Sequence, residues 1–312
     1  MSGWPVGATS RSVDLGASVH ALDFGGPEGA PVVLCVHGLG GSALNFGLLG
    51  PELARSFRVL AVDLLGHGGS GVPDAHDGAG SRAGGMQAEV DRQVRMLSDF
   101  VDEVVGEPVV LVGHSLGGVI SALYALERPQ DVSRLVLLGP PVPHAGADRR
   151  DRKLAAKLAF LRMPGVGRLV LRTMRRTPPD ETVRRQLADA TPHVDAIPAE
   201  AVTASIEETA RRSGRADAES ARRLQWQSIL GTLSLLAGAA DWRLRLDGLQ
   251  APVLWLHGED DLLSPVADGR DLATGRGWEF RSRPGVGHLP HLEDVAWTAE
   301  QIAGWSPSSG EG

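Results

Sequence analysis

Short apolar runs that alternate with helical patterns are the feature that most restricts the fold of this 312-residue chain. The runs consist mainly of β-branched residues and leucine, and they are Val32–Val36, Val59–Val62, Val109–Val112, Leu135–Leu138 and Val253–Leu256. Such runs are typical of strands that are buried on both faces of a parallel sheet. Helical patterns lie between them at Ala43–Arg55, Met86–Val105 and Val119–Glu127. This alternation predicts an α/β fold with a mostly parallel central sheet and flanking helices.

The middle of the chain interrupts the alternation. From about Pro141 to Leu246 no convincing strand pattern is found, and helical segments recur instead. We therefore expect a helical cap at residues 141–245, inserted after the sixth strand. It would be carried on a core formed by residues 1–140 and 246–312 and would not be an independent domain.

The two ends of the chain have patterns of their own. Residues 11–24 alternate weakly about Gly16-Ala17, which predicts a small hairpin. The tail, residues 306–312, is rich in serine, glycine and proline and is expected to be disordered. No secretory signal pattern starts the chain, and no run reads as the roughly 20 apolar residues that a bilayer span needs. We therefore expect a cytoplasmic protein without stable membrane anchoring.

One apolar run leads directly into a serine flanked by glycines. Residues 108–118 read Pro-Val-Val-Leu-Val-Gly-His-Ser-Leu-Gly-Gly, and a helical pattern follows at once. The glycines on both sides of Ser115 permit a sharp strand-to-helix turn that exposes the serine, an arrangement called a nucleophile elbow. The N-terminus of the following helix favours negative charge that develops there. The alternative is a turn for packing or phosphate binding, which no G-x-G-x-x-G or Walker sequence supports.

A second glycine-rich turn, His37-Gly38-Leu39-Gly40-Gly41, follows the run Val32–Val36. An enzyme that transfers an acyl group must bind the oxyanion of its tetrahedral intermediate with preorganised N–H donors. This turn can supply one donor, and the residue after the serine can supply the other. We expect the backbone N–H groups of Leu39 and Leu116 to form this oxyanion hole. A plain glycine turn is the alternative.

An acidic turn and a histidine turn follow near the C-terminus. The last apolar run leads into His257-Gly-Glu-Asp-Asp261, and a later loop reads Gly285-Val-Gly-His288. A serine hydroxyl is a poor nucleophile until an imidazole accepts its proton, and that imidazole needs a carboxylate to fix its tautomer. The chain order Ser115, Asp261, His288 is the order expected for a catalytic triad built around a nucleophile elbow.

With these motifs the sequence resembles the α/β-hydrolase fold superfamily, specifically its branch of capped serine hydrolases that use no cofactor. The resemblance covers about residues 11–140 and 246–305, and the helical insertion would be the variable cap. Asp63-Leu-Leu-Gly-His-Gly-Gly-Ser70 matches the family's Asp-x-x-Gly-x-Gly-x-Ser loop. Gly258-x-x-Asp261-x-x-x-Pro265 matches its acid loop, and Gly287-His288 with Leu292-Glu293 matches its histidine loop. The resemblance implies the α/β-hydrolase fold and a reaction that requires neither a cofactor nor a metal.

Two of the site residues have neighbours that could replace them. Glu259, Asp260 and Asp261 are adjacent, and the family spacing selects Asp261, with Asp260 as the next choice. His291 lies three residues beyond His288, and the glycine before His288 favours the latter. The resemblance also implies structural roles in turns for Asp63, His37, His67, His114 and His257.

The motifs and the resemblance together predict a serine hydrolase that cleaves carboxylic esters, a carboxylesterase or a monoacylglycerol-type lipase, through an acyl-enzyme on Ser115. A serine at this position sets the chain apart from haloalkane dehalogenases and epoxide hydrolases, which need an aspartate there. Thioesterase, lactonase, carbon–carbon bond hydrolase and cofactor-free haloperoxidase activities share the triad and stay open. A non-catalytic, ligand-binding member of the fold and acyl transfer to an alcohol or amine stay open as well.

Composition restricts the partners of the protein. The formal net charge of −7 gives no overall attraction to nucleic acid, so the expected partner is a small-molecule ester. The single cysteine, Cys35, cannot form an internal disulfide and is expected to be a buried thiol.

One region of the predicted cap is basic, with 12 Lys and Arg against 4 Asp and Glu between Ala145 and Arg185. Leucines are interleaved with its arginines, which are Arg149, Arg150, Arg152, Arg162, Arg168, Arg172, Arg175 and Arg176. This pattern is typical of amphipathic helices that pack leucine inward and expose arginine. A weak contact with anionic membrane surfaces or anionic amphiphiles is the alternative interpretation.

Overall fold

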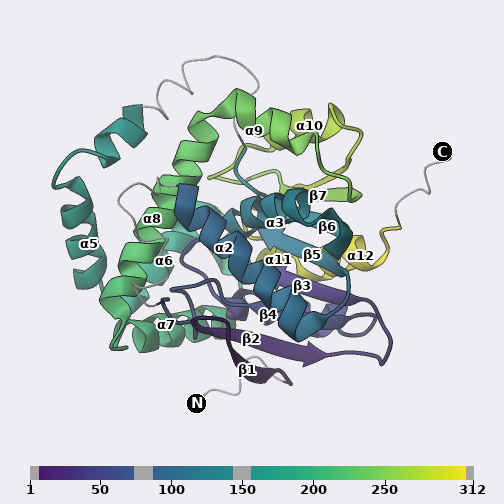
Figure 1. Cartoon of the computed structure of the whole chain (residues 1–312), viewed down its shortest axis with the longest axis horizontal. Helices are drawn as coiled ribbons and strands as arrows, with labels where there is room; N and C mark the ends of the chain where they lie inside the picture. The colour runs from purple at the N-terminus through teal and green to yellow at the C-terminus, as the bar shows by residue number, and fades with distance from the viewer. Residues whose placement is uncertain (1–6, 74–86, 143–155, 307–312) are drawn as a thin grey trace.

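A computed structural model of the protein describes residues 7–73, 87–142 and 156–306 (Figure 1). An eight-stranded sheet with the strand order β1-β2-β4-β3-β5-β6-β7-β8 forms its centre. The strands are β1 (Thr9–Asp14), β2 (Ser18–Gly25), β3 (Val32–Val36), β4 (Arg58–Val62), β5 (Val109–His114), β6 (Val132–Leu138), β7 (Val253–Gly258) and β8 (Glu279–Arg283). β2 pairs antiparallel with β1 and β4, and the other pairs are parallel. The predicted α/β fold and N-terminal hairpin are both confirmed.

The central strand β3 shows why the apolar runs are continuous. Val32, Leu34 and Val36 pack on one face of the sheet, and Val33 and Cys35 pack on the other. All of them are fully buried, because neighbouring strands and helices cover both faces. Burial also raises the pKa of the Cys35 thiol, as expected for a cysteine of the core.

Helices cover the two faces of the sheet separately (Figure 1). One face carries α2 (Gln87–Phe100), α3 (Leu116–Glu127), α9 (Ala239–Leu246) and α10 (Val266–Thr274). The opposite face carries the 3-10 turn η1 (Ala43–Phe46), α1 (Leu49–Leu53) and α12 (Val295–Ala303). The sheet is therefore the middle of three layers, and the loops that follow its parallel strands emerge at one edge.

The cap predicted after the sixth strand is present between β6 and β7. It contains α5 (Val166–Arg176), α6 (Pro179–Ala190), α7 (Ala199–Ser213) and α8 (Ala218–Ala237), and α9 leads back to the sheet. From residue 156 to residue 246, all within the described part, the chain forms no strand. Figure 1 shows α5 to α8 together at the left of the sheet. None of the helices within the described residues has both the length and the apolar character to span a bilayer.

Two helical patterns are interrupted in the structure. The segment 43–55 forms η1 and the short α1, because Pro51 has no N–H and is tolerated only in the first turn of an α-helix, which begins at Leu49. The segment 86–105 forms α2 and then a wider turn at Val101–Val105, which ends at Gly106 with a φ of 72°. Apart from Ser306, the predicted disordered tail lies outside the described residues.

Candidate active site

Ser115 lies in the turn between β5 and α3 and has a strained backbone. Its φ is 50° and its ψ is −119°, and within the described ranges no other residue except glycine has a positive φ. A conformation of this kind costs about 1–3 kcal/mol and persists only where the surrounding structure enforces it. Ser115 is partly exposed, whereas His114 and Leu116 on either side are buried. The turn therefore presents the serine, as predicted for a nucleophile elbow.

Close backbone approach explains the glycines around this turn. A Cβ on Gly113 would lie 2.6 Å from the carbonyl oxygen of Gly117, and a Cβ on Gly117 would collide with the backbone of Val36. A Cβ on Gly38 would lie 3.1 Å from Cβ of Ser115. Glycine is therefore required where the turn after β3 meets the turn that carries Ser115.

The two predicted oxyanion donors belong to these adjacent turns. Leu116 is the first residue of α3, where backbone N–H groups have no acceptor within the helix. As far as the chain is described, neither the Leu116 N–H nor the Leu39 N–H donates a hydrogen bond. His37 holds the second turn, since its Nδ1–H donates to the carbonyl oxygen of Gly38 at 2.7 Å. Binding of an oxyanion by Leu39 and Leu116 stays a prediction.

Asp261 and His288 come from the loops after β7 and β8 and are directly joined. His288 Nδ1 lies 2.8 Å from Asp261 Oδ2. The other oxygen of Asp261 accepts the N–H groups of Leu263 and Ser264, each at 2.8 Å. The Asp261 side chain is fully buried. Burial alone would raise its pKa, but hydrogen bonds from His257, from His288 and from the backbone outweigh burial and lower it to about 2.

This hydrogen bond determines the tautomer of His288. Asp261 is ionised, so Nδ1 of His288 must be the donor, which leaves Nε2 of the neutral ring as a lone-pair acceptor. The backbone oxygen of His288 accepts a hydrogen bond from Nε2 of His114 at 2.9 Å, and the two rings lie 4.9 Å apart. His288 is therefore packed against the residue that precedes Ser115.

The structure brings the three predicted catalytic residues to one edge of the sheet, but it joins only two of them. Among the described residues, no hydrogen bond connects Ser115 Oγ with His288. Catalytic hydrogen bonds in free enzymes are often long and tighten when substrate binds. The catalytic roles of Ser115, Asp261 and His288 therefore stay predictions, which the arrangement of their loops supports.

The alternative acid and base occupy different surroundings. Asp260 is half-exposed and its Oδ2 lies 2.8 Å from Nε2 of His193 in the cap. His291 is fully buried, and neither ring nitrogen has a hydrogen-bond partner in the described structure. Burial, together with the charge of His288, lowers the pKa of His291 to about 3. Neither residue is joined to the Asp261–His288 pair by a hydrogen bond in the part of the chain that is described.

Two further residues support the pair. His257 accepts the indole N–H of Trp255 at Nδ1, so its Nε2 carries a proton and lies 3.2 Å from Asp261 Oδ2. Glu293 accepts the N–H groups on both sides of His288, those of Gly287 at 2.7 Å and Leu289 at 2.8 Å. The sequence reasoning did not predict either contact. A histidine four residues before the acid was the only signal for the first, and it indicates a turn as readily as a contact.

Asp63 occupies a turn, as expected, and has no contact with the Asp261–His288 pair. Its Oδ1 accepts the N–H of Ala43 at 2.6 Å, and its Oδ2 accepts from Gly69 N–H and His20 Nδ1, both at 2.7 Å. Burial would raise the pKa of Asp63, but these partners outweigh it and lower the pKa. Three or more potential metal ligands do not gather anywhere within the described residues.

A family model described as the alpha/beta hydrolase fold matches residues 31–164, which include the turns around Leu39 and Ser115. An uncharacterized protein of Mycobacterium tuberculosis is 34% identical over 142 residues, which is 46% of this chain and 37% of that protein. The match thus spans little more than a third of that relative's length.

Two other similarities extend over most of the chain. A 2-hydroxy-6-oxononadienedioate/2-hydroxy-6-oxononatrienedioate hydrolase of Cupriavidus pinatubonensis is 28% identical over 272 residues, covering 86% of this chain and 82% of that protein. The crystal structure of a haloalkane dehalogenase loop variant from Bradyrhizobium elkanii superimposes with a TM-score of 0.70 at 21% identity, and it covers 96% of both chains. The structural similarity establishes the fold.

Proposed function

We propose that this chain, which belongs to the α/β-hydrolase fold superfamily, is a serine hydrolase that cleaves carboxylic esters. The observation that carries the proposal is the backbone of Ser115, whose positive φ is found in a partly exposed serine at the N-terminus of α3. Packing alone does not require a strained backbone at a partly exposed serine. It is the position from which a hydroxyl can attack a carbonyl group and leave negative charge near free N–H donors.

In the proposed reaction, Ser115 Oγ attacks the ester carbonyl carbon, and its proton passes to Nε2 of His288. The carbonyl oxygen becomes an oxyanion that accepts the N–H groups of Leu39 and Leu116, while Asp261 stabilises the imidazolium of His288. When the carbon–oxygen bond breaks, His288 gives the proton to the leaving alcohol. Water then loses a proton to His288 and attacks the acyl-enzyme. The bond between the acyl carbon and Ser115 Oγ breaks, His288 returns the proton to Oγ, and the acid is released.

Substitution of the nucleophile tests this proposal. Ser115→Ala should lower kcat on p-nitrophenyl esters by about 10⁴-fold or more. Ser121→Ala is the matched control, because this buried serine lies in the same α3 and its hydroxyl has no hydrogen-bond partner among the described residues. The control should keep most of the activity. A Ser115→Ala variant within tenfold of the wild-type rate would show that the serine is misassigned.

Carbon–carbon bond hydrolysis is the second candidate. The Cupriavidus pinatubonensis hydrolase is similar to this chain over 86% of its length, which includes the cap. The same residues would serve, since attack by Ser115 on a ketone carbonyl would expel a carbon leaving group that is stabilised by a neighbouring carbonyl. A panel of esters, thioesters, lactones and a 2-hydroxy-6-oxo dienoate separates the two candidates. A kcat/KM for the dienoate above that for every ester would favour the second.

A further inference from the structure

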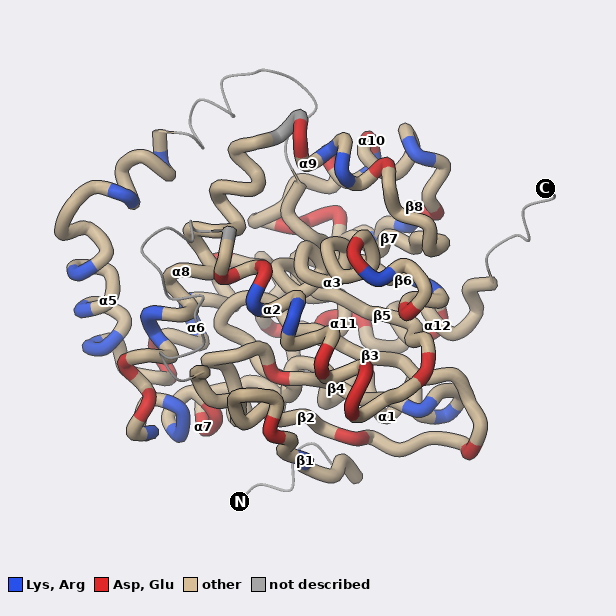
Figure 2. The backbone as a smooth tube through the Cα atoms, in the orientation of Figure 1, with Lys and Arg blue, Asp and Glu red and all other residues tan. Residues whose placement is uncertain are grey.

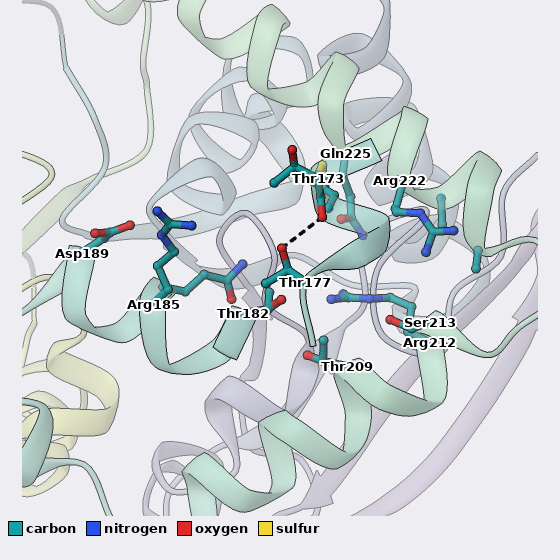
Figure 3. A pocket seen from close by; sticks show the side chains of 14 residues that line it. Thr173, Thr177, Thr182, Arg185, Asp189, Thr209, Arg212, Ser213, Arg222 and Gln225 are labelled. Carbon is teal, nitrogen blue, oxygen red and sulfur yellow. Dashed lines mark hydrogen bonds between the residues drawn. The ribbon is translucent and has the colours of Figure 1, made fainter. Parts of the chain in front are cut away.

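A cavity of about 250 Å³ lies among the cap helices α5, α6, α7 and α8 (Figure 3). We call it the cap cavity. Three arginines line it, Arg185 from α6, Arg212 from α7 and Arg222 from α8, and Asp189 is its one acidic residue in the described structure. Figure 3 shows the Arg212 and Arg222 side chains on the α7 and α8 side, with Arg185 across from them on α6. The lining therefore carries an excess of positive charge.

The side chains of two of these arginines are mostly buried, and some of their N–H groups lack a hydrogen-bond acceptor among the described residues. The Arg212 side chain is 11% exposed and the Arg222 side chain is 16% exposed. Arg212 Nη1 and Arg222 Nε are buried and have no hydrogen-bond partner in the described structure. Glu208 lies 3.8 Å from Arg212 Nη1, and Arg222 Nη2 donates a hydrogen bond to Glu219 at 3.3 Å. An oxyanion in the cap cavity would offer both guanidinium groups further acceptors in the geometry that they prefer.

The other polar groups of the cap cavity leave the arginines as its main donors. The hydroxyls of Thr173, Thr177 and Thr182 each donate to the backbone carbonyl four residues earlier in the chain. Such hydroxyls can accept a further hydrogen bond but have no proton left to donate. The arginines are therefore the charged donors of the cap cavity, and they favour a negatively charged ligand.

The cap cavity adjoins the turn that carries Leu39. Gln186 and Thr209 line it and also line a smaller cavity of about 50 Å³, whose opposite wall is formed by Gly40 and Gly41. A Cβ on Gly40 would lie 2.6 Å from Nε2 of Gln186. Gln186 of α6 thus lies between the cap cavity and Gly40, the residue that follows Leu39.

We propose that the cap cavity binds an anionic group, a carboxylate or a phosphate, at the far end of a substrate whose carbonyl lies at Ser115. This inference rests on the proposed function and deepens it, because it names the substrate class as esters that carry a second, negatively charged end. Arg212 and Arg222 are the residues that bind this end. Gln186 lies between them and the reacting carbonyl.

Paired substrates of equal length test the preference. The p-nitrophenyl monoester of adipic acid and p-nitrophenyl hexanoate differ only in the terminal carboxylate. We expect wild-type kcat/KM for the adipate monoester to exceed that for the hexanoate by about tenfold or more. Arg212→Gln and Arg222→Gln should each lower this ratio by about ten- to a hundredfold, the usual effect of losing a hydrogen bond to a charged group.

Neighbouring arginines supply matched controls. Arg211 and Arg223 precede and follow the two cavity arginines on the same helices, are exposed and do not line the cap cavity. Arg211→Gln and Arg223→Gln should leave both the activity and the ratio as in the wild type. A wild-type ratio near one, or a high ratio that survives Arg212→Gln and Arg222→Gln, would overturn the proposal.

A binding measurement separates failure of this inference from failure of the proposed reaction. Calorimetry with adipate and with inorganic phosphate requires no turnover, so it works even if the protein hydrolyses neither ester. Binding of adipate, of phosphate or of both to the wild type, weakened about tenfold or more by Arg212→Gln, supports the anion site, and the better ligand identifies the group. Absence of binding by both ions at 10 mM, or binding that Arg212→Gln leaves unchanged, would contradict it.

Discussion

Nε2 of His257 lies 3.2 Å from Oδ2 of Asp261, the same oxygen that accepts the hydrogen bond from His288. This Nε2 also lies 2.8 Å from the backbone oxygen of Ser264, and Nδ1 of His257 accepts the indole N–H of Trp255. The carboxylate thus receives two imidazoles and two backbone N–H groups. Its orientation toward His288 is set by groups that take no part in the chemistry.

His257→Gln should therefore impair catalysis through Asp261. We expect kcat to fall by about ten- to a hundredfold with little change in KM, because a hydrogen bond to a buried charge is lost while the substrate pocket is intact. Trp255→Phe is a companion variant, since it removes the donor to Nδ1 of His257 together with part of a buried indole ring. Steady-state kinetics on one ester measures both variants. A raised KM with unchanged kcat would contradict a positioning role for His257.

The two adjacent aspartates should respond very differently to amide substitution. Asp261→Asn should lower kcat by about 10⁴-fold, because the amide can no longer hold the imidazole in the tautomer that accepts the serine proton. Asp260→Asn is the control, since Asp260 pairs with His193 of the cap at a half-exposed position. It should change kcat by less than about threefold, because it removes only this half-exposed hydrogen bond. Equal losses in the two variants would contradict the choice of Asp261.

Much of the fold could be predicted because burial on both faces leaves a direct trace in the sequence. β3 and β5 are read as continuous apolar runs, since each of their residues packs against a helix or a neighbouring strand. The position of Ser115 could be predicted as well, because Gly113 and Gly117 are needed where chains approach closely. Each of these requirements restricts the residue type at a particular position, so it can be recognised in the sequence.

Other features depend on distant segments, and the sequence does not encode them locally. The contact between His257 and Asp261 depends on how the loop after β7 folds back, and the ion pair of Asp260 with His193 depends on the packing of the cap. The helical periodicity of α7 and α8 likewise does not indicate that Arg212 and Arg222 line one cavity between the cap helices. The pattern of a helix predicts that its polar residues are exposed, and only the position of the neighbouring helix shows which of them are buried.

The buried His291 should make stability sensitive to acid. The folded-state pKa of about 3 lies below the ordinary value near 6.5, so the unfolded chain binds a proton that the folded chain excludes. The free energy of unfolding contributed by this group is intact above pH 6.5 and falls as the pH drops toward 3. In His291→Leu this loss disappears. Between pH 7 and pH 5 the stability difference should shift by about 2 kcal/mol in favour of the variant.

Urea unfolding of wild type and His291→Leu at pH 7, 6 and 5 measures this shift. Each protein is compared with the other at the same pH, so protonation of all other groups cancels. Activity of His291→Leu near that of the wild type would also separate this residue from His288, whose substitution by glutamine should abolish turnover. Parallel stability curves over this range would show that His291 is not held neutral.

The exposed face around α5 leads to a last prediction, and we propose that it contacts anionic membrane surfaces. Arginines follow one another along this helix (Figure 2), and the large side chains of Phe160, Met163 and Leu169 are exposed beside them.

Leu169→Glu should weaken sedimentation with phosphatidylglycerol vesicles about tenfold or more, since it removes apolar contact and adds like charge. Leu244→Glu is the matched control, because Leu244 on α9 is 68% exposed and Leu169 is 65% exposed. Binding that is absent in the wild type, or equally weakened by both substitutions, would leave α5 as an ordinary amphipathic helix with arginine in solvent.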